Sequence, residues 1–310
     1  MRITNNLGLP DAFVRAASTG AFPPKLWRHR VSQLTGSAKV RWFELTHWDE
    51  LESDASERLW SVMGSALHHV LHQHCGSNEI AEERLTYMHK IDDQDVAISG
   101  QADLLTQIGP DSYRITDWKF CKIAALSYDK TSWLMQLRCY AWLYSLMGFP
   151  VKEAELVLIL RNREAFKAIY TPDYPQSDIV RYPVDLWDFS TVESWSREMS
   201  HRLVVADKLV VAGANEEDLP LCTDEERWYS PSRWAVKKAR ATRASRVFRD
   251  EAEAVAYMAS RGKPDEYGID FRPGRSTKCH WCAARSICQQ WAAQKVLEAV
   301  DSTDEEGDDA

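Results

Sequence analysis

"ISGQADLLTQIGPDSYRITDWKFCK", residues 98–122, is the stretch of sequence that decides the fold. Its centre, GPDS at residues 109–112, is a turn signal between two runs with the composition of strands. We therefore expect residues 95–106 and 113–120 to pair as a β-hairpin. An antiparallel pair of this kind predicts a sheet in the centre of the domain.

The charged residues of this hairpin form a candidate cation site. Asp117 and Lys119 are two apart, so their side chains share one face of the strand. Pairing would bring Asp103, three residues after Gly100, beside Asp117, and two neighbouring carboxylates repel unless a positive charge lies between them. A divalent metal with oxygen ligands would supply that charge. The alternative is a solvated or ion-paired strand face.

The flanking segments predict helices and further strands. Residues 55–74 carry apolar side chains at helical spacing, and residues 132–147 read as a largely buried helix that residues 148–150, GFP, end. Residues 81–89 and 153–162 have the composition of strands. The order of helix, three strands, helix and strand predicts an α/β core.

Two pairs of polar residues lie on the predicted helices at a spacing of four. Gly64 and His68 share one helix face, where the glycine would let another backbone approach and the histidine could bind a metal. Gln136 and Tyr140 bring hydrogen-bonding groups to an otherwise apolar helix. The alternatives are a packed or surface histidine, a core tyrosine and a partly exposed glutamine.

The ordered set of these motifs resembles the PD-(D/E)XK nuclease superfamily, in particular its RecB-like branch of CRISPR-associated and phage exonucleases. The resemblance covers about residues 55–165 and rests on G-x-x-x-H (64–68), G-x-x-D (100–103), D-x-K (117–119) and Q-x-x-x-Y (136–140). It implies a restriction-endonuclease-like fold, in which helices flank a mixed central sheet. It also implies metal-dependent hydrolysis of DNA to leave 5′-phosphate ends.

The resemblance assigns the metal ligands residue by residue. His68, Asp103, Asp117 and the backbone carbonyl of Trp118 would bind Mg²⁺ or Mn²⁺. Hard cations held by carboxylates suit phosphodiester hydrolysis, because they activate water and neutralise the phosphate oxygens.

Other residues would act beside the metal. Lys119 would activate the attacking water and stabilise the charge that develops on phosphorus. Gln136 and Tyr140 would position the DNA strand and the lysine. Glu83 would be an auxiliary acid, with Glu82 as the competing choice.

A cysteine cluster follows near the C-terminus. Cys279, Cys282 and Cys288 form C-x₂-C-x₅-C, which leaves the fourth position of a metal site open. Zinc would close it with a cysteine or with His280, and a [4Fe–4S] cluster would need a fourth cysteine. Cys222 is the best placed by chain order, and Cys75 is second.

The resemblance favours the iron–sulfur cluster over zinc, because RecB-like nucleases with this C-terminal spacing carry one. This sequence departs from many of those enzymes, since no cysteine precedes His68. We therefore assign Cys222 as the fourth ligand and expect the cluster to pin the C-terminal segment in place. Cys121 and Cys139 fall inside predicted core elements and are expected to be structural thiols.

Composition divides the chain into three parts: a nuclease core with an N-terminal helical region (1–215), a basic hairpin and cluster-binding segment (216–295), and an acidic disordered tail (296–310). The basic segment could bind phosphates or be a solvated face; its cations are Arg233, Lys237, Lys238, Arg240, Arg243, Arg246 and Arg249. Residues 40–48 and Trp133 are candidate surfaces on which DNA bases could stack.

The bulk composition places few limits on the partner. The net charge is −8, but the last ten residues hold six carboxylates, so the rest of the chain carries only −2. Such a balance is compatible with DNA, and the acidic tail could shield the DNA groove or bind a protein partner. No apolar run is long enough for a membrane span and the N-terminus does not resemble a signal peptide, so we expect a cytoplasmic protein.

The leading interpretation is a Mg²⁺- or Mn²⁺-dependent exonuclease acting on single-stranded or duplex DNA ends in recombination, repair or phage replication. Two alternatives stay open. One is a nucleic-acid-binding module that has the fold without catalysis. The other is a zinc-stabilised protein-interaction domain.

Overall fold

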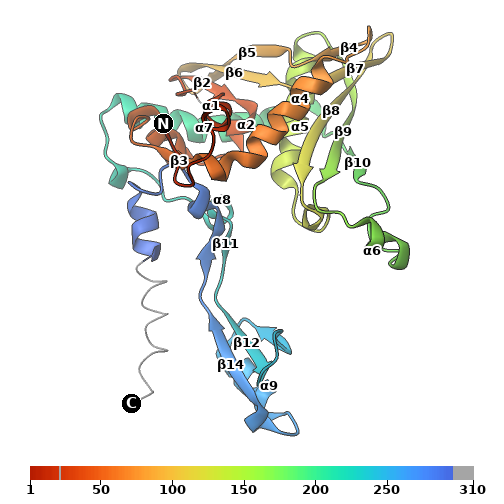
Figure 1. Cartoon of the computed structure of the whole chain (residues 1–310). Coiled ribbons are helices and arrows are strands. Elements are labelled where there is room, and N and C mark those ends of the chain that lie inside the picture. Colours follow the sequence, from red (N-terminus) through yellow and green to blue (C-terminus); the bar gives the residue numbers. More distant parts are fainter. Residues whose placement is uncertain (21, 296–310) are drawn as a thin grey trace. The chain divides into compact units, whose positions relative to one another are not determined.

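The computed structural model describes residues 1–20 and 22–295 and divides the chain into two compact units. The first unit ends at Leu219 and the second begins at Pro220 (Figure 1). The predicted acidic tail, residues 296–310, lies outside the described residues.

The first unit contains a mixed set of strands and helices. Its elements in chain order are β1 (Arg2–Thr4), α1 (Asp11–Ser18), β2 (Arg28–Arg30), α2 (Val31–Leu34), α3 (Ala38–Thr46), β3 (Glu52–Asp54), α4 (Leu59–His72), β4 (Glu79–Ala81), β5 (Arg84–Ile91), β6 (Gln94–Gln101), β7 (Leu104–Gly109), β8 (Ser112–Cys121), α5 (Thr131–Leu146), β9 (Val151–Leu160), α6 (Ala165–Tyr170), β10 (Ile179–Val184) and α7 (Phe189–Val211).

A five-stranded mixed sheet is the centre of this unit. Its strand order is β10-β9-β8-β7-β4, in which β8 and β9 are parallel and the other neighbours are antiparallel. Helix α5 makes the crossover that a parallel β8–β9 pair requires. A smaller sheet, β2-β6-β5, lies beside it in the unit. The predicted fold class, a mixed central sheet flanked by helices, is confirmed.

The predicted hairpin forms over only part of its length. Strand β7 pairs with β8, and Leu104 lies opposite Thr116, but the run predicted as one strand over 95–106 breaks at residues 102–103. Its first half, β6, instead pairs with β5 in the smaller sheet. The prediction was wrong here because the alternating pattern continues through the break, and pattern alone does not show that a strand changes sheets.

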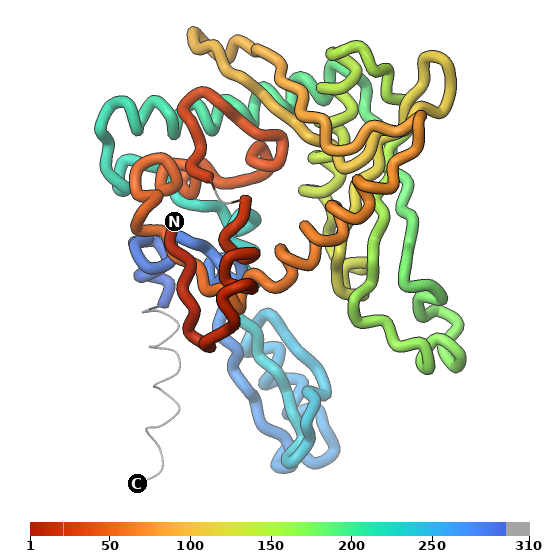
Figure 2. The backbone as a smooth tube through the Cα atoms, turned by 45° about the horizontal axis from the view of Figure 1, so that its top comes forward, coloured from red at the N-terminus to blue at the C-terminus, as the bar shows by residue number. Residues whose placement is uncertain are grey.

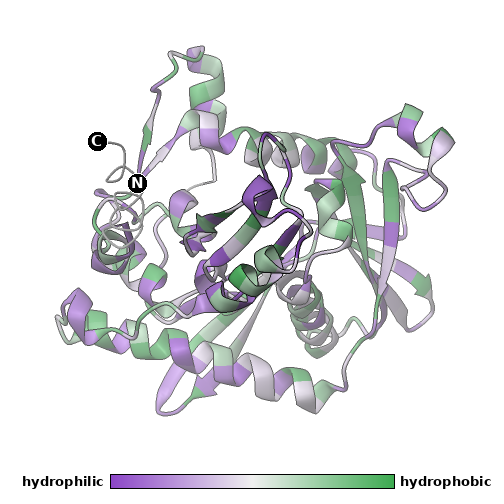
Figure 3. Ribbon diagram, turned by 90° about the horizontal axis from the view of Figure 1, so that it is seen from below, coloured by the Kyte–Doolittle hydropathy of each residue, from purple (hydrophilic) through white to green (hydrophobic). Residues whose placement is uncertain are grey.

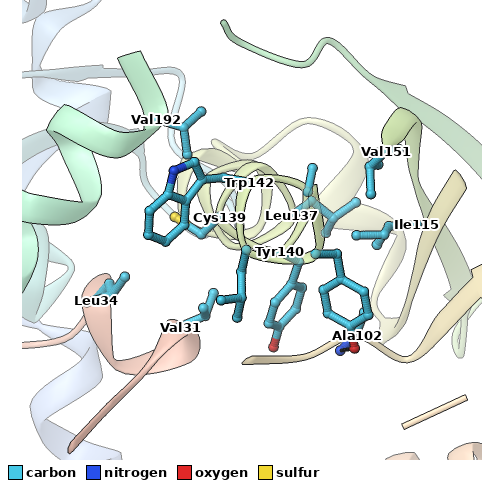
Figure 4. Close-up of a cluster of buried hydrophobic side chains, with 14 of the residues drawn as sticks. Val31, Leu34, Ala102, Ile115, Leu137, Cys139, Tyr140, Trp142, Val151 and Val192 are labelled. Atoms are coloured by element: carbon cyan, nitrogen blue, oxygen red, sulfur yellow. Dashed lines mark hydrogen bonds between the residues drawn. The ribbon is translucent and has the colours of Figure 1, made fainter. Parts of the chain in front are cut away.

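Helix α5 is the centre of the hydrophobic core. Figure 4 shows apolar side chains of neighbouring elements on several sides of this helix. The prediction of a largely buried helix is confirmed, and Gly148, with φ at +94°, ends it in a conformation that suits glycine. Most of the side chains of α5 are apolar, and the helix packs against the five-stranded sheet on one side and against α7 on another.

A fully buried polar network ties the N-terminal segment to α7. The guanidinium of Arg41 donates to both carboxylate oxygens of Asp207, at 2.6 and 2.8 Å. His29 lies between Ser200, 2.7 Å from Nδ1, and Asp207, 3.2 Å from Nε2. Because the arginine already balances the carboxylate, burial dominates and lowers the pKa of His29.

Helix α4 is unusual because none of its residues is buried, although its sequence is apolar. Figures 1 and 2 show it lying obliquely between the N-terminal segment and the five-stranded sheet. It contacts α1 at one side and β8 at the other. Much of the surface of this helix is therefore exposed.

The second unit contains a small sheet and a cysteine-bearing segment. Its elements are α8 (Asp224–Arg227), β11 (Tyr229–Ser230), β12 (Arg233–Lys238), β13 (Arg246–Phe248), α9 (Glu251–Ala259), β14 (Tyr267–Arg272) and β15 (Arg275–Ser276). Strands β12 and β13 form the predicted basic hairpin, and β14 completes the sheet on the other side of β12. Val236, Phe248 and Ala254 of α9 make its small core.

Helices of the described ranges do not combine the length and apolar character that a membrane span needs. Figure 3 shows polar residues interspersed with apolar ones along them.

Candidate active site

Strand β8 carries the acid and the base of the site. Asp117 is 1% exposed, and its Oδ2 lies 2.6 Å from the Nζ of Lys119. Burial, which outweighs the attraction of the lysine, raises the pKa of Asp117 to about 6. The predicted shared face of these two residues is therefore present, and the buried carboxylate is one that a further cation would stabilise.

Asp103 lies in the break between β6 and β7. Its Oδ2 accepts a hydrogen bond of 2.8 Å from the backbone N–H of Trp118. The β7–β8 register would place residue 102 opposite Trp118, but the pairing of the two strands begins only at Leu104. The carboxylate of Asp103 therefore takes the place of a strand partner for the backbone N–H of Trp118. The break brings the Asp103 charge close enough to raise the pKa of Asp117.

His68 projects from α4 toward these carboxylates. Its Nδ1 lies 3.3 Å from Oδ1 of Asp103 and 3.9 Å from Oε1 of Glu82. The hydrogen bond to Asp103 is the main cause of the raised pKa of His68. The structure therefore brings together the three residues Asp103, Asp117 and His68, from a break, a strand and a helix.

Of the two glutamates considered for the auxiliary acid, Glu82 is the one whose side chain faces His68, whereas the sequence assignment was Glu83 with Glu82 as the alternative. Glu82 has a positive φ of 54°, which turns its side chain toward α4, where Oε2 also lies 3.4 Å from Nδ1 of His72. Glu83 is exposed, and its backbone carbonyl accepts a hydrogen bond from Tyr144. Adjacent residues point in different directions at such a turn, and sequence spacing does not tell which one faces inward.

The predicted Gln136–Tyr140 pair forms on α5. The Gln136 amide donates to the hydroxyl of Tyr140 at 2.8 Å. Tyr140 is 6% exposed, and burial raises its pKa, to which the nearby Asp117 and Asp103 add. Its ring rests on Gly100, where a Cβ would lie 2.9 Å from Cδ1 of Tyr140. Gly100 is thus a close-packing glycine, and this fixes the helix against the strand that leads to Asp103.

Gly64 does not have the role expected from the sequence. A Cβ at this position would meet nothing within 4 Å, so no backbone approaches it in this structure. The prediction failed because a glycine in a helix can mark open space as well as close packing, and only the neighbouring elements distinguish the two.

Two further residues at the site were missed by the sequence analysis. Tyr144 accepts a hydrogen bond of 3.1 Å from the backbone N–H of Ala102 and donates to the carbonyl of Glu83, so it ties the break before Asp103 to the turn at residues 82–83. It is one turn after Tyr140, and that spacing could have indicated it. Trp60, on the same side of α4 as His68, was also missed.

The donor set suits a hard divalent cation, because it consists of carboxylates and an imidazole, and because the buried carboxylate of Asp117 already attracts a positive charge, the ammonium of Lys119. In residues 1–20 and 22–295, no three histidine, cysteine or acidic side chains are arranged as a preformed metal site. His68 and Lys119 pair with Asp103 and Asp117 instead. The imidazole and the ammonium therefore lie beside the carboxylates where a metal cation would bind.

In the second unit, the four predicted cysteine ligands lie on two chain segments, and in the part of the chain that the structure describes they are not arranged as a preformed metal site. The side-chain oxygen of Gln290 accepts a hydrogen bond from the backbone N–H of Cys222, and its amide nitrogen donates to the carbonyl of Cys222, both at 2.9 Å. These bonds hold Cys222 beside the segment of Cys288. Burial raises the pKa of Cys279 to about 11, and the other three cysteines add to this. The two other cysteines with an expected role, Cys121 and Cys139, lie in the core of the first unit.

Comparison with known proteins finds one family. A family model described as the PD-(D/E)XK nuclease superfamily matches residues 15–289. Among solved structures, SSO0001 is 16% identical with a TM-score of 0.45, and the match covers 61% of this chain and 82% of that one. A phage related exonuclease from Haemophilus somnus 129PT is 15% identical with a TM-score of 0.36, covering 61% and 98%. No curated protein matches the chain.

Proposed function

This chain belongs to the PD-(D/E)XK nuclease superfamily, and we propose that it is a Mg²⁺- or Mn²⁺-dependent exonuclease that acts on DNA ends in the cytoplasm. The observation that supports this most is the convergence of Asp103 and His68 on the buried pair of Asp117 and Lys119. Two acids and an imidazole can hold a divalent cation, and a lysine can stabilise the charge that develops in metal-assisted hydrolysis of a phosphodiester. Recombination, repair and phage replication are the proposed settings.

Asp103, Asp117, His68 and the carbonyl of Trp118 would hold the cation, which supplies positive charge to the phosphate and lowers the pKa of a water. In the hydrolysis, a water oxygen forms a bond to phosphorus while the bond to the 3′ oxygen breaks, leaving a 5′-phosphate and a protonated 3′-hydroxyl. Lys119 would stabilise the negative charge on phosphorus, since its ammonium lies 2.6 Å from Asp117 in the same site.

The neighbouring groups would position these residues. Gln136 and Tyr140 hold each other across one turn of α5, and the tyrosine ring is fixed over Gly100. Glu82 would keep His68 oriented toward the carboxylates. Of the two glutamates proposed from the sequence, we therefore favour Glu82 over Glu83 as the auxiliary acid.

We propose that Cys222, Cys279, Cys282 and Cys288 bind a [4Fe–4S] cluster, with Zn²⁺ as the alternative. Burial, and after it the neighbouring cysteines, disfavour the thiolate of Cys279, which is why its pKa is raised. A bound cationic centre would reverse this effect and join the Cys222 segment to the C-x₂-C-x₅-C segment. The cluster would thus stabilise the second unit.

The second unit would contribute to DNA binding through its basic hairpin. Lys238, Arg240, Arg243, Arg246 and Arg249 are exposed on or beside β12 and β13. Their charge would give a salt-dependent affinity for phosphates. The acidic tail would shield the DNA groove or bind a protein partner.

A second candidate function is a DNA-binding module without catalysis. His68 pairs with Asp103, and Lys119 pairs with Asp117. This favours the binding module, because the groups that would bind a metal are paired with each other. Cleavage assays decide between the two candidates.

The test uses end-labelled linear DNA incubated with Mg²⁺ or Mn²⁺, with EDTA as the control. We expect stepwise release of nucleotides from linear DNA and no cleavage of a closed circle. Lys119→Ala should lower the cleavage rate at least about 100-fold and leave DNA affinity unchanged. Wild-type protein that binds DNA and cleaves neither substrate would establish the binding module instead.

A further inference from the structure

An aromatic residue lies on the same stripe of α4 as the site histidine. Trp60, Gly64 and His68 are spaced by four, so they follow one another along one face of the helix. At about 1.5 Å per residue, Trp60 lies about 12 Å from His68 along the helix axis. Gly64, between them, has open space on its Cα, so nothing of the first unit fills the gap at that point.

Trp60 is held in place but left accessible. Its ring lies 3.7 Å from the guanidinium carbon of Arg161 and 5.8 Å from the ring of Phe120. It is nevertheless 46% exposed. A large aromatic surface that is fixed by its neighbours and open to solvent is suited to stacking with a planar group.

Arg161 adds a positive charge at the same place. Within the ranges that the structure describes, no carboxylate pairs with it, and its Nε is buried without a hydrogen-bond acceptor. Its backbone N–H bonds the carbonyl of Cys121 at 2.9 Å, two residues beyond Lys119 on β8. An unpaired guanidinium stacked on an aromatic ring can bind a phosphate while keeping the ring in position.

Strand and helix give similar separations between this pair and the site. Phe120 is three residues from Asp117 on β8, which is about 10 Å at 3.3 Å per residue. The corresponding length on α4, from Trp60 to His68, is about 12 Å. Helix α4 contacts β8, and a stacked single strand that spans this distance would extend over about three nucleotides, at about 3.4 Å each.

The stacking surfaces expected from the sequence are less suitable. Trp42 and Phe43, in residues 40–48, are 4% and 3% exposed and belong to the interior. Trp133 packs partly against the core. The expectation was wrong for Trp42 and Phe43, because an aromatic residue is more often buried than exposed and burial depends on distant elements. Trp48 and Trp133 are partly exposed and stay predictions.

We propose that Trp60 and Arg161 form a subsite that binds a single DNA strand about three nucleotides from the scissile phosphate, with a base on the indole and a phosphate on the guanidinium. This rests on the proposed nuclease function for the position of the scissile bond. The ligand is an unpaired strand, because a base inside a duplex already stacks on its neighbours. The subsite favours single-stranded or frayed ends over an intact duplex.

The test measures fluorescence anisotropy of labelled oligonucleotides in EDTA, so that no cleavage occurs. Trp60→Ala should weaken affinity for a single-stranded oligonucleotide about 5- to 100-fold and leave affinity for a blunt duplex unchanged. Trp60→Phe should retain most of the affinity. Arg161→Gln should weaken binding and reduce the slope of log K against log salt by about 0.7.

Trp187 provides the matched control. It is 41% exposed and lies 4.2 Å from the guanidinium of Arg138, so it is an arginine–tryptophan pair of the same kind, on a different part of the first unit. Trp187→Ala should leave single-strand affinity unchanged. The subsite is refuted if Trp60→Ala binds like wild type, or if both variants lose affinity equally. Trp60-dependent binding by a protein that does not cleave DNA would refute the nuclease function and leave the subsite standing.

Discussion

The carboxylate of Asp103 accepts a hydrogen bond from the backbone N–H of Trp118 at 2.8 Å, while its other oxygen lies 3.3 Å from Nδ1 of His68. One side chain thus closes the break between two strands and joins the helix to the sheet. The structural and the chemical role of Asp103 can be separated, because an amide can fill the first and not the second.

Asp103→Asn is expected to keep the bond to Trp118 and to lose the charge. Its free energy of unfolding should change by less than about 1 kcal/mol, while cleavage falls at least about 100-fold. Asp103→Ala leaves a backbone donor unpaired and should cost about 1–3 kcal/mol. Urea denaturation and end-label release measure the two effects. Full activity of the asparagine variant would remove Asp103 from the metal site.

Glu82 and Glu83 offer a test of which neighbour serves the site. Glu82→Gln removes the carboxylate that faces His68 and should lower activity about 10- to 100-fold, as is typical when a group that orients a ligand is lost. Glu83→Gln should have no effect, because the backbone of Glu83, not its side chain, binds Tyr144. Initial cleavage rates at saturating metal decide; the reverse pattern would restore the assignment of Glu83.

Two glycines should respond oppositely to the same substitution. In Gly100→Ala the new Cβ would lie 2.8 Å from Leu143 and 2.9 Å from Tyr140, so we expect a loss of about 1–3 kcal/mol. In Gly64→Ala the Cβ meets nothing within 4 Å, and the helix should gain about 0.5–1 kcal/mol. Thermal or urea unfolding measures both. A destabilised Gly64→Ala would contradict the open position of that residue.

His29 predicts a loss of stability in acid. Its pKa is lowered by burial, so below the ordinary value of about 6.5 the unfolded chain takes up a proton that the folded state refuses, and stability falls as pH falls. His29→Gln should remove this dependence, which is at most about 1.4 kcal/mol per pH unit. Urea titrations at about pH 7.5 and about pH 5.5 compare the two proteins. Ser200→Ala should keep the slope, and a wild type that gains stability in acid would show that Asp207 dominates instead.

The cysteine cluster predicts a colour and its loss. Anaerobically purified protein should show a broad absorption band near ~400 nm, which Cys222→Ser, like serine at any of the other three positions, should abolish. Cys75→Ser should retain it, because Cys222 is the cysteine held beside the segment of Cys288. Metal analysis accompanies the spectrum. A colourless protein with one bound zinc would show that the site binds zinc instead of an iron–sulfur cluster. An unchanged band in Cys222→Ser would show that another residue is the fourth ligand.

The sequence determined the features that follow from a local period. The strand period of two placed Asp117 and Lys119 on one face, and the helix period placed Gln136 within reach of Tyr140. Together with the turn at 109–112 and the apolar run of α5, these predicted the mixed sheet, its central hairpin and its core helix. Such features need no knowledge of distant segments, because hydrophobic pattern and backbone geometry specify them.

The tertiary structure alone decided what depends on contacts between segments far apart in the chain. It broke the strand at residues 102–103, turned Glu82 rather than Glu83 toward His68, buried Trp42, and set Arg161 against Trp60. Whether an aromatic ring is covered, or a glycine crowded, is fixed by the element that packs over it. That element lies elsewhere in the sequence, and no local pattern records its position.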